Sequence, residues 1–363
     1  MQGQKRYLSG LTHIIHKERE KKMANGNDIG IDLGTTKVMI YKEGEGVVLN
    51  EPSVVAYDAN TGVPFAFGKE AFLMVGKTHK NIVAEYPLND GVISNYTLTK
   101  EMVKYFISKA YSSKVVKPKV CICVPSAVTG IEENAVIDAA VSSGARQVFL
   151  IEEPIAAAIG AGIDVLRANG NIIVDIGGGT TDVAVISLGG IVCSKSIKIA
   201  GNTFDREISK AIKNKYNFVV GQRTVQNLKH EVANCMPGED ENVVYKVKGI
   251  NLLKGLPGTL EISTQDIYPI IEPIISEILA AVKQVLEVTP PELSGDIFEN
   301  GVMLTGAGAK IKNLDKYLES HLTTKVQLAE NPEMCVAIGT GKSFSLEGQL
   351  ESGFRDVTPG LSR

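Results

Sequence analysis

The sequence is poor in several features that would mark common classes of protein. It has no tryptophan, aromatic residues make up 6% of its 363 residues, and the formal net charge is −3. A chain so close to neutrality is not a general binder of nucleic acid or other polyanions, so any recognition of phosphate must be local. No apolar run reaches the roughly 18 residues that span a bilayer. These absences predict a protein that is soluble or peripheral to a membrane.

Cysteine is also scarce, and its pattern excludes two kinds of site. The five cysteines are odd in number, and they form neither a CxxC pair nor a cluster with metal-ligand spacing. This usage favours buried, reduced thiols in a cytosolic protein over a disulfide framework or a zinc site. The residues are Cys121, Cys123, Cys193, Cys235 and Cys335.

The stretch from Asn171 to Ser187, NIIVDIGGGTTDVAVIS, is the most informative part of the chain. An apolar run leads into Asp175, and an alternating apolar run follows the turn, which is the pattern of strand, tight turn and strand. The N–H groups and hydroxyls of such a turn can bind phosphate oxygens, and the preceding carboxylate can hold a metal-bound water beside them. A glycine-rich hairpin without a ligand is the alternative. The candidate phosphate ligands are Gly177, Gly178, Gly179, Thr180 and Thr181.

The same pattern occurs earlier, in the stretch 28–41, DIGIDLGTTKVMIY. Here an apolar run leads into Asp32, and the turn again combines glycine with two threonines. Two phosphate-type hairpins in one chain of this length predict two similar α/β domains facing each other across a nucleotide cleft. The candidate ligands in this turn are Gly34, Thr35, Thr36 and Lys37.

A third glycine-containing segment follows the apolar run GVMLT and is expected to open a helix. Its backbone could lie flat against a ring or a ribose, and a helix N-terminus could face an anion. It is not a dinucleotide fingerprint, because Ile311 stands where the third glycine would be. The candidate adenosine contacts are Gly306, Ala307, Gly308, Ala309 and Lys310.

The segment Gly339 to Ser343, GTGKS, looks like the end of a Walker A motif. That motif requires a glycine five places before the Gly-Lys pair, where this chain has Val336, and no strand precedes the segment. We therefore reject a P-loop here.

The motifs DLGTT, DIGGGTTD and TGAGAKI, in this order, resemble the two phosphate motifs and the adenosine motif of actin, sugar kinases and heat-shock chaperone ATPases. More narrowly, YPLNDGVI, VPSAVTGIEENAVIDAA, FLIEEPIAAAIGAG, LKGLP and TPPEL are similar to the bacterial actin MreB and its paralogues. The resemblance covers about residues 28–345. It implies an actin-like α/β fold, in which two ribonuclease-H-like domains, each with a subdomain, enclose a cleft for ATP and Mg²⁺.

The resemblance also implies domain bounds and residue roles. Domain I is expected over 28–165 with an insertion at about 50–95, and domain II over 166–346 with an insertion at about 205–265. Asp32 and Asp175 would hold magnesium, mostly through water, and Glu132 would position the water that attacks the γ-phosphate. A solvated first-turn glutamate is the alternative for Glu132. The resemblance adds Gly201, Gln226 and Lys229 to the nucleotide-binding residues already named.

Three departures from the family pattern bear on these roles. The family has Ala-Asn where this chain has Thr36-Lys37, so Lys37 either reaches a phosphate or projects away. The family commonly has glutamate at the position of Gln226, which favours Lys229 as the nucleotide contact. Val115 and Val116 are smaller than the apolar pair on the family's membrane loop, so membrane binding would depend on the N-terminus.

The two ends of the chain stand apart from the domains. Residues 1–27 combine lysines and arginines with apolar residues at helical spacing, which is typical of a basic amphipathic helix on an anionic membrane, with a disordered extension as the alternative. They lack the continuous apolar core of a secretory signal. Residues 347–363 are polar and contain glycine and proline, and we expect a flexible tail.

The function implied by the resemblance is that of a slowly hydrolysing ATPase that polymerises into filaments and organises cell-wall synthesis and rod shape. Its partners would be further copies of itself, an anionic membrane surface and membrane proteins of cell-wall elongation, at the inner face of the plasma membrane. The alternatives are an FtsA-like division protein, a chaperone-type ATPase and a sugar-kinase-type enzyme on the same fold. FtsA lacks the insertion after the first hairpin, and no further signature supports a kinase.

Overall fold

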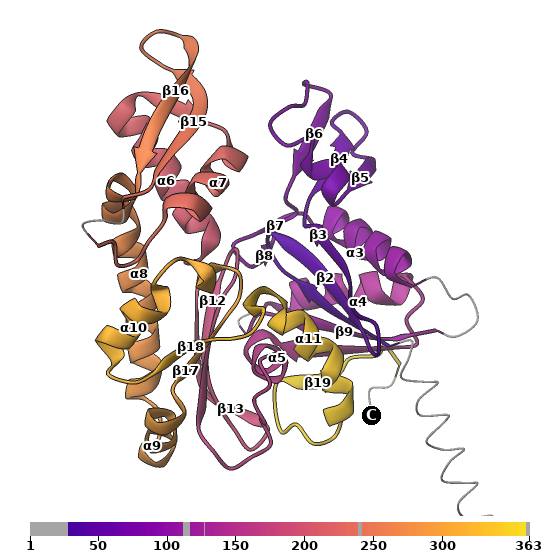
Figure 1. Cartoon of the computed structure of the whole chain (residues 1–363). Helices are drawn as coiled ribbons and strands as arrows, with labels where there is room; N and C mark the ends of the chain where they lie inside the picture. The colour runs from indigo at the N-terminus through magenta and orange to yellow at the C-terminus, as the bar shows by residue number, and fades with distance from the viewer. Residues whose placement is uncertain (1–27, 112–116, 127, 239–241, 361–363) are drawn as a thin grey trace, which may run out of the picture.

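The computed structural model describes residues 28–111, 117–126, 128–238 and 242–360. Two α/β units, each built on a central sheet, lie side by side, and each carries a smaller sheet toward the same end of the molecule (Figure 1). The expected membrane helix at 1–27 and the valine pair Val115 and Val116 lie outside the described residues.

The first unit contains a six-stranded sheet in the order β19, β10, β9, β1, β2, β3. Strands β1 to β3 form an antiparallel meander, and β9 and β10 run parallel to β1. Helices α3 and α4 cover one face and form an apolar core with it. The bounds are β1 Ile29–Leu33, β2 Lys37–Lys42, β3 Gly46–Pro52, β9 Lys119–Val124, β10 Gln147–Glu152, β19 Phe354–Asp356, α3 Tyr96–Ala110 and α4 Gly130–Ser142.

The second unit contains a five-stranded sheet in the order β13, β12, β11, β17, β18. Helices α6, α8 and α10 supply apolar faces to its core. Helix α8 begins at a capping box in which Ser263 and Asp266 satisfy each other's backbone N–H groups. The bounds are β11 Asn171–Ile176, β12 Thr181–Ser187, β13 Gly190–Ile197, β17 Val302–Thr305, β18 Val326–Leu328, α6 Gly201–Tyr216, α8 Thr264–Glu287, α9 Pro291–Asn300 and α10 Leu314–Leu322.

Apart from the edge strand β19, the two central sheets share one topology. Each has an antiparallel hairpin and third strand on one side, and two strands parallel to its first strand on the other. The repeated DLGTT and DIGGGTT patterns therefore stand at the same place in two equivalent sheets. This duplication confirms the inference that two similar halves face each other.

Smaller elements extend each unit. Strands β4 to β6 and helix α2 form a separate lobe within residues 55–85, and β14 to β16 with α7 form another within 218–263. A two-stranded hairpin, β7 to β8, returns the chain to the cleft. The bounds are β4 Val55–Asp58, β5 Pro64–Phe67, α2 Lys69–Phe72, β6 Ile82–Glu85, β7 Leu88–Asn89, β8 Val92–Ile93, β14 Phe218–Val220, α7 Gln222–Val232, β15 Val244–Asn251 and β16 Leu256–Ser263.

Helices α5 (Glu153–Gly160) and α11 (Cys335–Lys342) cross between the two central sheets (Figure 1). They approach so closely that a Cβ added to Gly160 would lie 1.8 Å from the carbonyl oxygen of Cys335, and one added to Gly339 would lie 1.7 Å from that of Ala156. The Gly339 to Ser343 segment is therefore a packing surface within and just after a helix, and the rejection of a P-loop there is confirmed.

The C-terminal segment corrects one expectation. The prediction of a flexible tail over 347–363 is wrong for β19, which pairs antiparallel with β10 at the edge of the first sheet. Phe354 stacks on Phe149 with ring centroids 5.3 Å apart, and Arg355 forms an ion pair with Glu133 of α4. The polar composition of the segment gave no sign of this strand. One aromatic contact and backbone pairing at the open edge of the sheet hold it in place.

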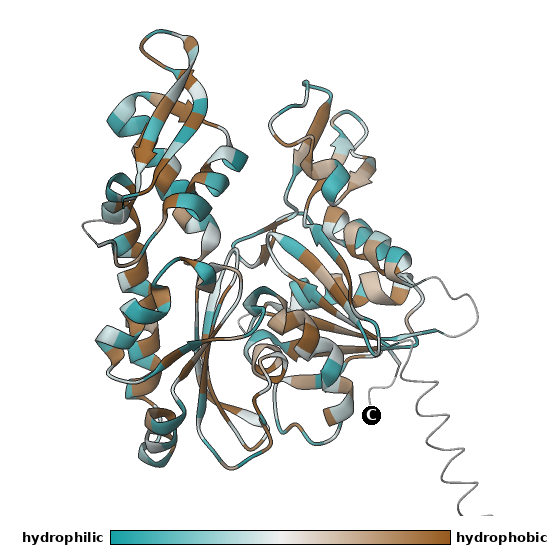
Figure 2. Cartoon of the chain, viewed as in Figure 1, coloured by the Kyte–Doolittle hydropathy of each residue, from teal (hydrophilic) through white to brown (hydrophobic). Residues whose placement is uncertain are grey.

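Figure 2 shows apolar residues along the strands of both central sheets and polar residues along much of α10. All five cysteines are free; four are buried, and Cys193 is half-buried. Within the part of the chain that the structure describes, none of the helices combines the length and the apolar character needed to span a membrane.

Candidate nucleotide site

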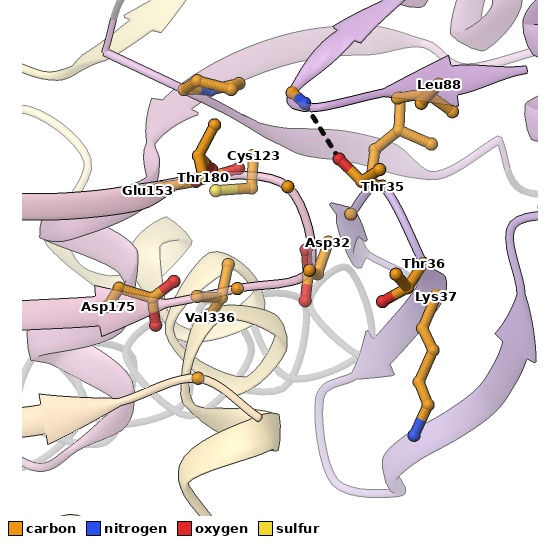
Figure 3. A pocket seen from close by; sticks show the side chains of 18 of the residues that line it. Asp32, Thr35, Thr36, Lys37, Leu88, Cys123, Glu153, Asp175, Thr180 and Val336 are labelled. Atoms are coloured by element: carbon orange, nitrogen blue, oxygen red, sulfur yellow. Dashed lines mark hydrogen bonds between the residues drawn. The ribbon is translucent and has the colours of Figure 1, made fainter. Parts of the chain in front are cut away.

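The tips of the β1–β2 and β11–β12 hairpins meet across the cleft (Figure 3). A Cβ added to Gly178 would lie 2.4 Å from Cγ2 of Thr36, and one added to Gly179 would lie 2.5 Å from Oγ1 of Thr35. Real side chains do not approach so closely, so only glycine allows the two turns to stand this near each other. Both turns line one cavity, together with Gly34, Lys37, Gly177 and Thr180.

Asp32 and Asp175 line the same cavity from corresponding strands, β1 and β11, and both are buried. Burial raises the pKa of Asp32 to about 8, with a further contribution from the charge of Asp175. Burial raises the pKa of Asp175 to about 7, against a hydrogen bond from Thr305 that lowers it. Two buried carboxyl groups whose ionisation is disfavoured by burial would be stabilised as carboxylates by a cation.

This donor set fits magnesium bound largely through water. Among the described residues there is no group of three or more potential side-chain ligands placed to hold a metal ion by themselves. Mg²⁺ typically keeps several waters and takes one or two carboxylates plus phosphate oxygens from a bound nucleotide. Asp32 and Asp175 match that requirement, and a nucleotide would supply the rest.

Glu132 lies at the third position of α4 and lines the same cavity. Its Oε2 accepts hydrogen bonds from the backbone N–H (2.8 Å) and the hydroxyl (2.6 Å) of Thr129, and its Oε1 accepts one from the N–H of Ile93 (3.1 Å). Burial alone would raise the pKa of Glu132, but these bonds bring it below its ordinary value. Because a carboxylate has about four acceptor positions, Oε1 retains one for a water molecule.

A second, adjoining cavity of about 480 Å³ continues from the hairpin tips, and the two share Thr36, Lys37, Gly177, Gly178, Ala307 and Glu333. Such a volume suits a small-molecule ligand. Lys229 bonds across it to the carbonyl oxygen of Gly201 (3.0 Å) and pairs with Asp205 (2.8 Å). The cavity is also lined by Gln226, Gly308 and Lys310, so the residues predicted to bind adenosine and those predicted to bind phosphates meet in one continuous cleft.

The family profile described as MreB/Mbl protein matches residues 26–352 of the chain. The chain belongs to the MreB/Mbl family. It is 49% identical over 315 residues to the cell shape-determining protein Mbl of Bacillus cereus, an alignment that covers 86% of this chain and 94% of that protein. The crystal structure of MreB5 of Spiroplasma citri bound to ADP is 39% identical and superposes with a TM-score of 0.83, covering 90% of this chain and 98% of that one.

The MreB/Mbl assignment carries the predicted fold with it. A structure described as the MamK double helical filament also superposes, with a TM-score of 0.75 at 20% identity over 87% of this chain and 98% of that one. At that identity the likeness concerns the fold alone. The predicted actin-like fold is confirmed.

Two of the predicted ligands in this MreB/Mbl chain do not line either cavity. The hydroxyl of Thr181 donates to the carbonyl oxygen of Ile199 (2.6 Å), and Ala309 is buried in the core of the second unit. Spacing within the turn could not reveal this, because Thr181 already belongs to strand β12.

The Gly306 to Lys310 segment forms a short 3₁₀ turn, Gly308–Lys310, and the expected helix starts later, at Leu314. The expectation of a helix N-terminus beside the ligand is therefore wrong. Gly306 instead has φ +83°, and a Cβ there would lie 2.2 Å from the carbonyl oxygen of Ile176. The close approach of this loop to β11 explains the glycine, and it leaves flat backbone facing the cavity.

Sequence reasoning missed two acidic residues, one that lines the cavity and one that is buried as the strand partner of Asp175. Glu153, at the start of α5, lines the cavity beside the phosphate hairpins. Asp182 is the cross-strand partner of Asp175 and is buried. Burial, followed by the charge of Asp182, raises the pKa of Glu153 well above its ordinary value. The final Asp of DIGGGTTD was the available signal, because it pairs with Asp175 across a two-stranded turn.

Proposed function

We propose that this chain is an ATP-binding, slowly hydrolysing bacterial actin that assembles into filaments at an anionic membrane surface and helps to organise cell-wall synthesis and rod shape. One observation carries the proposal. Two glycine-threonine hairpins meet tip to tip at a cavity that is also lined by a pair of buried aspartates and by a glutamate. The ADP named in the description of the MreB5 structure supports a nucleotide as the ligand.

Within this proposal, the hairpin tips bind the phosphates through backbone N–H groups and threonine hydroxyls, and the adjoining cavity takes the adenosine. Asp32 and Asp175 would hold Mg²⁺, largely through water, and the bound cation would supply positive charge beside the phosphate oxygens. Lys37 lines both cavities, which supports a contact with a phosphate in this chain.

Glu132 orients the attacking water. Its carboxylate is held in one orientation by three hydrogen bonds from Thr129 and Ile93, and its lowered pKa keeps it an acceptor at neutral pH. Phosphoryl transfer to water depends chiefly on in-line placement and charge neutralisation. One fixed acceptor with a free lone pair would supply the placement.

Filament formation and the membrane role rest on the family. The matched relatives include a protein described as cell shape-determining, and a filament is described for the more distant MamK. These descriptions support self-association and a part in cell shape, and they favour this role over FtsA-like division, chaperone or kinase activity. Membrane proteins of cell-wall elongation are the expected further partners, at the inner face of the plasma membrane.

Electron microscopy and phosphate release on the purified full-length chain test the proposal together. With ATP and Mg²⁺ we expect filaments, slow phosphate release and, with anionic vesicles, filaments on lipid. ATP hydrolysis without filaments at any protein concentration would favour a chaperone-type ATPase. Transfer of phosphate to a sugar would establish a kinase. Absence of nucleotide binding would overturn the proposal altogether.

A further inference from the structure

The turn of the β7–β8 hairpin, Asp90 and Gly91, lies between the two halves of the cleft. Both residues have positive φ, 46° and 75°, which is the geometry of a two-residue hairpin turn that Asp-Gly favours. A Cβ added to Gly91 would lie 2.5 Å from Cγ2 of Thr180, and one added to Gly179 would lie 2.7 Å from Cα of Asp90. The turn belongs to the first unit, yet it packs directly on the phosphate hairpin of the second.

Backbone N–H groups of this hairpin bind two residues of the candidate site, Thr35 and Glu132. The N–H of Gly91 donates to Oγ1 of Thr35 (3.0 Å; Figure 3), and the N–H of Ile93, two residues on, donates to Oε1 of Glu132 (3.1 Å). The first bond leaves the Thr35 hydroxyl proton free for a phosphate. The second fixes the oxygen that retains a lone pair for water. A displacement of the turn would therefore misplace a phosphate ligand and the water acceptor together.

The side chain of Asp90 ties the turn to the second unit. Its Oδ2 lies 3.7 Å from Nη1 of Arg206 on α6, while its Oδ1 is buried without a hydrogen-bond partner in the described structure. Helix α6 is itself fastened to the second phosphate hairpin, because the N–H of Asn202 donates to the carbonyl oxygen of Gly178 (2.8 Å). A continuous path of contacts thus runs from the second hairpin through α6 and Arg206 to the turn.

We propose that Asp90 is a positioning residue for hydrolysis: by pairing with Arg206 across the cleft, it holds the turn that orients Thr35 and Glu132, so that the water acceptor is correctly placed only when the two halves are closed on a nucleotide. The proposal rests on the ATPase function proposed above. Asp90 lines neither cavity, so it acts through the turn and touches no substrate.

A role of Asp90 through its ion pair with Arg206 must be distinguished from a long-range effect of charge on the site. Two single variants that change the net charge in opposite directions make this distinction. Asp90→Asn removes a negative charge, keeps the side-chain shape and tolerates positive φ, whereas Arg206→Gln removes a positive charge. If Asp90 and Arg206 act as a pair, both variants lower kcat for phosphate release in the same direction, by roughly two- to fivefold for a partly exposed pair. We expect KM for ATP to stay within about twofold, because the nucleotide contacts are untouched.

The double variant Asp90→Asn/Arg206→Gln should be no slower than the slower single variant, since either change already breaks the pair. Arg206→Lys should recover much of the wild-type rate. Lys210→Gln, which removes the same charge one turn further along α6, is the matched control, and its kcat should equal that of the wild type. Lys210 is exposed, and among the described residues its ion pair is with Glu207 of the same helix, which also lies 3.8 Å from Arg206.

The inference is overturned if the two single variants move kcat in opposite directions, if their losses multiply in the double variant, or if neither changes kcat. Arg206 is more than half exposed, so its variant remains informative even if Asp90→Asn were to fold poorly. Glu132→Gln in the same assay separates the positioning role of Asp90 from the proposed ATPase function. A wild-type chain that hydrolyses ATP, is slowed by Glu132→Gln and is unaffected at 90 and 206 removes only this inference, whereas a chain without ATPase activity removes the proposed function as well.

Discussion

Thr305 donates a 2.6 Å hydrogen bond from its hydroxyl to Oδ1 of Asp175, its register partner on the neighbouring parallel strand. The bond lowers the pKa of Asp175 against the effect of burial. Thr305→Val keeps the shape and removes the donor, so it should raise that pKa further. We expect Mg²⁺-dependent nucleotide affinity at neutral pH to fall by roughly tenfold, as a lost hydrogen bond to a charged group predicts.

Thr340→Val provides the control for that measurement by isothermal calorimetry. Thr340 is equally buried, but its hydroxyl donates to the carbonyl oxygen of Val336 within the same helix. The variant should bind Mg²⁺ and ATP as the wild type does. Equal affinities for both variants would show that Asp175 does not depend on Thr305 for its charge.

The buried aspartates make the stability of the cation-free chain depend on pH. Folding raises the pKa of Asp32 to about 8 and that of Asp175 to about 7, from 3.8. At any pH between the ordinary pKa of an aspartate and its raised pKa in the folded chain, the folded chain binds more protons than the unfolded chain. The contribution of these two groups to the free energy of unfolding therefore falls as pH rises through this range. Without Mg²⁺ and nucleotide, the melting temperature should decrease from about pH 6 to about pH 8.5.

Asp175→Asn should flatten that dependence, and Mg²⁺ with nucleotide should do so in the wild type, because the cation stabilises the ionised form. Mg²⁺-nucleotide affinity should increase over the same range, with proton release that calorimetry in two buffers can count. A melting temperature that rises with pH in the cation-free wild type, and equally in Asp175→Asn, would contradict this account.

Glu132→Gln keeps the size of the side chain and its contact with Ile93 but removes the carboxylate. Removing a group that positions the nucleophile should slow phosphate release by roughly 10²-fold, with nucleotide affinity nearly unchanged. Glu133→Gln is the neighbouring control, since Glu133 pairs with Arg355 of β19 and lines neither cavity. Single-turnover phosphate release measures both, and an unimpaired rate in Glu132→Gln would remove the role assigned to this glutamate.

The basic, amphipathic composition of residues 1–22 predicts binding to anionic lipid. Deleting them should abolish most sedimentation with vesicles containing phosphatidylglycerol, while nucleotide binding is retained, because the site begins at Asp32. Vesicles of phosphatidylcholine alone provide the lipid control and should bind the full-length chain weakly. If the truncated and full-length chains sediment equally, membrane attachment lies elsewhere in the molecule.

Phe354 should contribute measurably to stability even though it lies near the C-terminal end of the described chain. It stacks on Phe149 and pairs through its backbone with Ile151. Phe354→Ala should lower the free energy of unfolding by about 1–2 kcal/mol, less than a fully buried phenylalanine would, because the ring is only half-buried. Denaturant titration measures this, with Leu253→Ala, a highly exposed site, as the neutral reference.

The sequence predicted those parts of the fold and site in which local pattern and tertiary placement coincide. Asp32, Asp175 and the glycine-threonine turns could be found because strand, turn and strand are contiguous, and a repeated motif implies a repeated sheet. Glu153 and Asp182 were missed because their importance comes from burial beside other carboxyl groups. Thr181 and Ala309 line neither cavity, because a motif does not tell which way each side chain faces.

The edge strand β19 and the partner of Asp90 were hidden for a related reason. Three residues of mixed polarity carry no periodicity, and Phe354 finds its partner about two hundred residues earlier in the chain. Asp90 reads as an ordinary Asp-Gly turn, and only the placement of Arg206 on a distant helix gives it a partner.

The crossing of α5 and α11 leaves no spare room at the joint between the two halves. With backbone against backbone at Gly160 and Gly339, these helices have no room for even one more carbon atom between them. A methyl group introduced at either glycine would collide with the facing backbone and push the two helices apart, at a distance from the nucleotide. The separation of the two halves of the molecule thus depends on two residues that have no side chain, Gly160 and Gly339.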